Sequence, residues 1–183
     1  NWDGYVVKLH NGGQHLWSTY LGGSLNDYGQ GIAVDVSGAC YATGYTDSSG
    51  WVGGGWDTSH NGEYDGFFVK LNSAGVHLRS AYLGGADSDY GMGIAVDTTG
   101  TNIWVTGYTE STGWVFNGWH TAYSGNGDAF VAKIVDISIE GEGEPVIEGE
   151  GEVPAEGEGE ILPEGEGEIL PEGEGEPAEG ESS

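Results

Sequence analysis

Two glycine-bearing loops carry tryptophan pairs whose spacing suits ligand recognition. The four residues form two pairs with the same separation, Trp51 with Trp56 and Trp114 with Trp119. An exposed indole can stack on a sugar ring or seat a side chain of a partner protein. The same rings could instead pack between structural units, because a glycine-rich loop has few other large side chains to order it. The spacing predicts that all four lie on one face, with at least one exposed ring in each loop.

The first of these loops also carries side chains that suit a calcium ion. The candidate ligands, within residues 57–65, are Asp57, Asn61, Glu63 and Asp65. Carboxylate and amide oxygens are ligands that Ca²⁺ prefers. Most of the carboxylates are not repeated in the second loop, whose equivalent residues are His120, Ser124, Asn126 and Asp128. A calcium site and a merely solvated loop are both compatible with this pattern.

The sequence contains none of the common catalytic signatures. It has no H-E-x-x-H motif, no P-loop and no G-x-S-x-G motif, and its one cysteine excludes a cysteine pair for zinc. Gly29-Gln-Gly31 superficially resembles a dinucleotide-binding loop, but it precedes a strand rather than a helix. We therefore predict a protein without enzymatic activity and without a required cofactor.

The charge of the chain disfavours nucleic acid as a ligand, and its hydropathy predicts that no segment spans a membrane. A formal net charge of −26 repels phosphate, and the chain has only 4 basic residues. Nucleic acid is therefore a disfavoured ligand. No apolar run reaches the roughly 18 residues of a transmembrane helix, so we predict no membrane span.

The tryptophan loops belong to an internal sequence repeat. Residues 27–35 recur as 89–97 with a single difference, Gln30 against Met92. Leu-Gly-Gly, Thr-Gly-Tyr-Thr and Gly-Trp-Val also occur once in each copy. A repeat of this length is a structural unit that buries its apolar face against a neighbouring copy.

The repeat unit has the pattern of a four-stranded antiparallel meander. Its short apolar or alternating runs, 31–35, 39–45, 66–71 and 77–83, are separated by glycine-bearing turns. Meanders of this kind are typical of β-propeller blades. We expect about nine strands, grouped as two, four and three, which are too few to close a ring. On the innermost strands of the blades we expect four buried side chains: Ile32, Val34, Ile94 and Val96.

Composition divides the chain into two parts. Residues 1–139 contain every aromatic side chain, and we interpret them as a β-propeller repeat segment of about two and a quarter blades. Residues 140–183 hold more than half of the 30 acidic residues, in a repeat of Glu-Gly-Glu-Gly-Glu and short apolar spacers. We expect this tail to be a disordered Glu/Gly/Pro-rich linker. A polyanion that collects calcium or binds a cell wall is the alternative.

The order of the motifs resembles a known family. D-(G/A)-(Y/F)-x-x-K-(L/I), S-(T/A)-Y-L-G-G, D-Y-G-x-G-I-A-V-D-x-x-G and T-G-Y-T follow one another as in the SBBP-type bacterial β-propeller repeat. The similarity covers residues 3 to about 135. The long tryptophan-containing loops depart from its simplest pattern. The family resemblance implies secreted or cell-surface bacterial proteins, with many repeats and usually no assigned enzymatic activity.

These observations lead to one functional hypothesis and one alternative. We expect a non-catalytic, all-β propeller module that serves as a scaffold or binds a glycan or a protein through its tryptophan loops. Further propeller blades upstream of the chain would then be partners. The alternative is a segment of a propeller hydrolase or lyase whose active site lies on blades outside this sequence.

Overall fold

The computed structural model describes residues 1–136, and this part of the chain is built from antiparallel β-sheet without helices. Its strands are β1 (Gly4–Leu9), β2 (His15–Leu21), β3 (Asp27–Val34), β4 (Cys40–Thr46), β5 (Asp65–Leu71), β6 (His77–Leu83), β7 (Asp89–Val96), β8 (Asn102–Thr109) and β9 (Asp128–Val135). The predicted boundary after residue 139 and the predicted disordered linker 140–183 lie outside the described residues.

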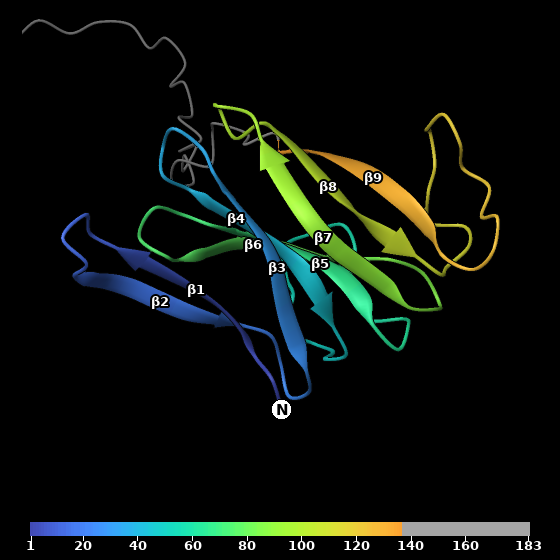
Figure 1. Ribbon diagram of the computed structural model, residues 1–183, viewed down its shortest axis with the longest axis horizontal. Coiled ribbons are helices and arrows are strands. Elements are labelled where there is room, and N and C mark those ends of the chain that lie inside the picture. Colours follow the sequence, from blue (N-terminus) through green and yellow to red (C-terminus); the bar gives the residue numbers. More distant parts are fainter. Residues whose placement is uncertain (137–183) are drawn as a thin grey trace, which may run out of the picture. The chain divides into compact units, whose positions relative to one another are not determined.

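The strands form three separate sheets of two, four and three strands, in the order β1-β2, β3-β4-β5-β6 and β7-β8-β9 (Figure 1). Every pairing joins strands that are consecutive in the sequence. The predicted all-β fold of repeated antiparallel meanders is therefore confirmed for residues 1–136, and the three sheets do not close a ring. We refer to them as the first, second and third sheets.

The innermost strand of each repeat is longer than the alternation of residues predicts. β3 begins at Asp27 rather than Gly31, and a bulge near Gly29 and Gly31 interrupts its pairing with β4. Gly44 of β4 makes this close pairing possible, since a β-carbon there would lie 1.8 Å from the carbonyl oxygen of Tyr28. Gly29 and Gly31 make the start of β3 hard to recognise in the sequence, and Gly44 on the partner strand allows this part of the pairing to form.

Two apolar clusters lie on opposite faces of the second sheet. Against the first sheet, the cluster consists of Val6, Leu21, Cys40, Ala42, Phe67, Val69 and Leu71. Against the third sheet, it consists of Ala39, Tyr41, Phe68, Leu83, Ile103, Val105, Phe130 and Ile134. Each face of the second sheet is therefore buried by a neighbouring repeat, as a repeat architecture requires.

None of the four predicted core residues is fully buried. Ile94 and Val96 pack partly buried against the cluster between the second and third sheets. Ile32 and Val34, in contrast, are 58% and 59% exposed, so the prediction is wrong for them. Their cross-strand partners Ala42 and Cys40 belong to the cluster that faces the first sheet.

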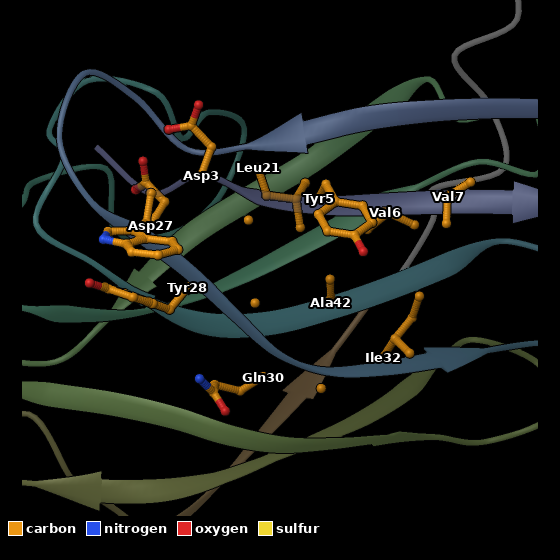
Figure 2. Close-up of a pocket in the computed structure, with 14 residues that line it drawn as sticks. Asp3, Tyr5, Val6, Val7, Leu21, Asp27, Tyr28, Gln30, Ile32 and Ala42 are labelled. Atoms are coloured by element: carbon orange, nitrogen blue, oxygen red, sulfur yellow. The ribbon is translucent and has the colours of Figure 1, made fainter.

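Ile32 and Val34 are exposed because the neighbouring first sheet is small and has two strands. Val6 and Leu21 of those strands cover the middle of the second sheet. Beside β3 they leave a groove of about 510 Å³, lined by Val6, Ile32 and Ala42 among others (Figure 2). An apolar side chain is buried only where a neighbouring element covers it.

Candidate functional site

A buried aspartate organises one end of each complete inner strand pair. The carboxylate of Asp27 accepts hydrogen bonds from the backbone N–H of Gly23 at 2.9 Å, from Ser48 Oγ at 3.1 Å and from Thr46 Oγ1. The same three bonds recur around Asp89, where the donors are Gly85, Ser111 and Thr109. Each network ties the loop before the innermost strand to the end of the next strand, which holds this end of the sheet in one geometry.

Burial changes the acidity of these carboxyls. Removal from water raises the pKa of Asp27 and of Asp89, and the hydrogen bonds to each carboxylate oppose this shift without cancelling it. The pKa of Asp65 is also raised by burial. A carboxyl that is costly to ionise in the folded protein and is surrounded by donors has a structural role at this end of the sheet.

The first tryptophan of each pair belongs to this scaffold. Trp51 Nε1 donates to Thr46 Oγ1 at 3.3 Å, and its ring meets Phe67 edge-on at 5.2 Å between centroids. Trp114 makes the equivalent bond to Thr109 at 2.9 Å, and its ring meets Phe130 at 4.9 Å. Both indoles are partly buried, which favours the packing interpretation for these two residues.

The second tryptophan of each pair is exposed to solvent. Trp56 is 57% exposed and stacks on Phe68 with 6.2 Å between ring centroids. Trp119 is fully exposed, and its nearest aromatic neighbour is the adjacent His120. Each loop thus exposes one of its two tryptophan rings to solvent. A role of these rings in ligand binding stays a prediction.

Sequence reasoning missed a tyrosine cluster beside the aspartate networks. It consists of Tyr28, Tyr45, Tyr64, Tyr90 and Tyr108. Cross-strand pairs stack within a sheet, with centroid distances of 4.7 Å for Tyr28 and Tyr45 and 4.4 Å for Tyr90 and Tyr108. Tyr45 also contacts Tyr90 edge-on at 4.9 Å, so the cluster continues from the second sheet to the third.

The tyrosine cluster is both accessible and rigid. Four of its rings are partly buried, and Tyr108 is 39% exposed. Four members are sequence neighbours of residues in the two aspartate networks, namely Tyr28, Tyr45, Tyr90 and Tyr108, and Tyr64 precedes the buried Asp65. Burial, followed by the neighbouring phenols, raises the pKa of Tyr45 and Tyr108. These hydroxyls therefore stay protonated at neutral pH, when each is able to donate and accept a hydrogen bond.

The repeated motifs contained a signal for this cluster. Tyr28 and Tyr90 occupy the same place in Asp-Tyr-Gly, and Tyr45 and Tyr108 occupy the same place in Thr-Gly-Tyr-Thr. A repeated aromatic residue at a strand end, next to a repeated buried aspartate, predicts a row of rings once the sheets are known to pack side by side. The contact between sheets is what the sequence alone did not show.

The structure uses the proposed calcium residues to shape their own loop. The buried carboxylate of Asp65 accepts hydrogen bonds from the backbone N–H groups of Asn61 at 2.7 Å and Gly62 at 3.1 Å. Asp57 accepts one from the N–H of Ser59 at 2.9 Å. Among residues 1–136, no three His, Cys, Asp or Glu side chains are grouped so as to hold a metal ion. Calcium binding by Asp57, Asn61, Glu63 and Asp65 stays an untested prediction.

Comparison with known proteins identifies the repeat. Residues 16–50 match the SBBP beta-propeller repeat. The match runs from β2 through β4 into the first tryptophan loop, and it confirms the resemblance that the motifs predicted. No curated protein matches the chain. Within the described part of the chain, no helix is long and apolar enough to cross a membrane.

Proposed function

We propose that this chain is a non-catalytic recognition module of an exported or cell-surface bacterial protein, and that it binds a glycan on the tyrosine cluster. The propeller repeats form the scaffold, and the loop end of the sheets provides the binding surface. Trp51 and Trp114 support this surface from within. Trp56 and Trp119 remain candidates for further contacts.

The observation that carries the proposal is the continuous contact of the five tyrosine rings. Partly buried rings lose little conformational freedom when a ligand binds, and their apolar faces and hydroxyl groups complement the C–H and O–H groups of a sugar. The aspartate networks hold the strand ends that carry these rings. Such preorganisation supports binding more than a set of mobile exposed rings would.

The charge of the chain narrows the class of ligand. Few basic side chains are available to the tyrosine cluster, because the whole sequence has 4 Lys and Arg and a net charge of −26. Electrostatic repulsion opposes anionic polysaccharides and nucleic acids. Neutral glycans are therefore the ligand class that the surface fits best, with a protein segment as the second choice.

Titration calorimetry with neutral oligosaccharides of glucose and of N-acetylglucosamine tests the proposal. We expect saturable binding that Tyr108→Ala weakens by about 1–3 kcal/mol, because one exposed stacking ring is lost. Tyr20→Ala is the matched control, since Tyr20 is 77% exposed and lies outside the cluster. Both variants should retain the melting temperature of the parent protein within a few degrees. Absence of binding to any neutral glycan, or equal binding by both variants, would contradict the proposal.

A further inference from the structure

Four asparagines of the sequence are each followed by glycine, and all four lie within residues 1–136. They are Asn11, Asn61, Asn117 and Asn126. The side-chain amide of asparagine can be attacked by the backbone nitrogen of the next residue, and glycine hinders this attack least because it has no β-carbon. Whether the attack takes place in the folded protein depends on whether the two reacting atoms are free to meet.

The first tryptophan loop holds Asn61 in place. Its backbone N–H and that of Gly62 both donate to the carboxylate of Asp65, at 2.7 Å and 3.1 Å, and its side-chain amide donates to the carbonyl of Ser59 at 3.0 Å. A β-carbon on Gly62 would lie 2.0 Å from the carbonyl oxygen of Asp87, so the backbone is closely packed here. Ring closure consumes the N–H of Gly62 and expels the side-chain nitrogen of Asn61, so it must break these hydrogen bonds.

The same loop is also bonded to β6 along residues 53–57. The N–H of Ser80 donates to the carbonyl of Gly53 at 2.8 Å, and the N–H of Tyr82 donates to the carbonyl of Asp57 at 2.9 Å. The N–H of Gly53 in turn donates to Ser80 Oγ at 2.9 Å. These bonds restrict the motion of the loop that carries Asn61.

Asn11 lies in the tight hairpin between β1 and β2. The N–H of Gly13 donates to the carbonyl of His10, and the N–H of His10 donates to the carbonyl of Gln14, both at 2.8 Å. The N–H of Gly12 donates to Nδ1 of His10 at 3.3 Å. The nitrogen that would attack Asn11 is therefore bonded to a side chain of its own turn.

Asn126 lies in the turn that precedes β9. The N–H of Gly127 donates to the hydroxyl of Tyr123 at 3.1 Å, and the N–H of Ser124 donates to the carboxylate of Asp128 at 2.5 Å. The turn is thus bonded on both sides of Asn126, and its attacking nitrogen is engaged.

Asn117 lies in an open part of the second tryptophan loop, between β8 and β9 (Figure 1). Asn117 and Gly118 are exposed, and so are the neighbouring Phe116 and Trp119. Apart from its chain neighbours, a β-carbon on Gly118 would have one contact within 4 Å, the side chain of Thr121 at 3.8 Å. Among residues 1–136, no hydrogen bond engages the side chain of Asn117 or the N–H of Gly118. The target amide and the attacking nitrogen are therefore free to meet.

We propose that Asn117 is a site of spontaneous deamidation and that it reacts before the other three Asn-Gly pairs. The nitrogen of Gly118 forms a bond to Cγ of Asn117 while its proton passes to hydroxide or a buffer base. The bond between Cγ and Nδ2 then breaks, and the side-chain nitrogen takes up a proton and leaves as ammonia. Water opens the resulting succinimide ring at either carbonyl, which gives aspartate or isoaspartate.

Deamidation adds a negative charge to the second tryptophan loop. Asn117 and Gly118 line a groove of about 720 Å³, together with Trp56, Trp114 and Phe130 among others. The products therefore place a carboxylate at a largely aromatic groove, and isoaspartate also lengthens the backbone of the loop by one carbon atom. This site is separate from the tyrosine cluster, and the inference does not depend on glycan binding.

Mass-spectrometric peptide mapping of the full-length chain, incubated at about pH 8 and sampled over time, tests the proposal. We expect Asn117 to deamidate about tenfold faster than each of the other three, because ring closure there breaks no hydrogen bond and one such bond corresponds to about tenfold in rate. Enzymatic methylation of isoaspartyl carboxyl groups should label the same peptide. The rate at Asn117 should rise with pH, because a base removes the proton of Gly118.

Concentrated urea provides the first control, because it removes the fold and leaves the sequence unchanged. In urea the four pairs should react at similar rates, since each consists of asparagine and glycine. Equal rates at Asn117 and Asn61 in the folded chain would overturn the proposal, as would a lead of Asn117 that persists in urea. Faster reaction at Asn11 would also overturn it, and would indicate that His10 acts as the base.

Two variants provide a matched pair. Gly118→Val places a branched side chain beside the attacking nitrogen at an open position, so it should slow deamidation of Asn117 by about tenfold or more. Gly12→Val is the control, since Gly12 is also exposed, and it should leave the rate at Asn117 unchanged. Both variants should keep the melting temperature of the parent chain. An unchanged rate at Asn117 in Gly118→Val would contradict attack by the backbone nitrogen.

Discussion

The two tryptophan loops, residues 46–64 and 109–127, have the same tryptophan spacing but different contacts. Trp51 and Trp114 make the same hydrogen bond to a threonine and the same edge-on contact with a phenylalanine. Beyond these residues the loops diverge. The first loop pairs with β6, and the second has no strand to pair with among residues 1–136. Local contacts therefore determine the inner tryptophan of each loop, whereas the neighbouring strand determines the conformation of the rest.

Removal of an inner tryptophan should have the largest effect on stability. We expect Trp51→Ala to lower the free energy of unfolding by about 3 kcal/mol, because it empties a volume packed against Phe67 and Tyr82. Trp114→Ala should cost less, since Trp114 packs on Phe130 but has no counterpart of Tyr82 among residues 1–136. Urea denaturation measures both values. An equal cost for the two variants would show that β6 adds nothing to the first loop.

Disruption of the aspartate networks should have the next largest effect on stability. Asp89→Asn should destabilise the fold by about 1–3 kcal/mol, because an amide cannot accept all the hydrogen bonds that the carboxylate accepts. Asp27→Asn should behave alike, since its network is the same in the other repeat. A much smaller loss at one of the two positions would show that the repeats are not equivalent at this end.

The pH dependence of that loss follows from the raised pKa of Asp89. In the folded protein this pKa lies above its ordinary value of 3.8. The folded state therefore binds the proton more tightly than the unfolded state, and the stabilisation is present at low pH and is lost as the pH rises through the folded pKa. The gap in unfolding free energy between the parent and Asp89→Asn should be larger at about pH 4 than at about pH 7. A gap that grows with pH would contradict the assignment.

Removal of one hydrogen bond between the first loop and β6 should have a smaller effect on stability. Ser80→Ala removes the hydroxyl that accepts a hydrogen bond from the N–H of Gly53, which should cost about 1 kcal/mol. Limited proteolysis should then cut residues 53–57 faster, while cleavage of the second loop stays unchanged. Unchanged cleavage of the first loop would mean that the backbone bonds to Ser80 and Tyr82 suffice.

The smallest effect on stability is expected at the outer tryptophan of the second loop. Trp119 is fully exposed, so Trp119→Ala should change the unfolding free energy by less than about 0.5 kcal/mol. Trp56→Ala should cost more, because Trp56 stacks on the buried Phe68. Thermal denaturation distinguishes the two. A loss at Trp119 as large as that at Trp56 would show that the second loop is held by contacts of its own.

The sequence predicted the sheets better than it predicted burial or the site. Alternating apolar residues and glycine turns are local features, and they identified nine strands in groups of two, four and three within residues 1–136. The start of β3 was missed because Gly29 and Gly31 lack the side chains from which a strand is recognised. Ile32 and Val34 were expected in the core because their pattern is that of Ile94 and Val96. The tyrosine cluster was missed because it joins residues of two sheets.

The sequence by itself determined the repeat, its strands and the resemblance to the family, because each depends on features that recur within one copy. The burial of Asp27 and Asp89 came from the structure. The tertiary structure decided which repeated residues differ in their surroundings. Ile32 differs from Ile94, and Trp119 from Trp56, although each pair is equivalent in the sequence. Burial and contact depend on the neighbouring sheet, and the neighbours of the first, second and third sheets are not the same.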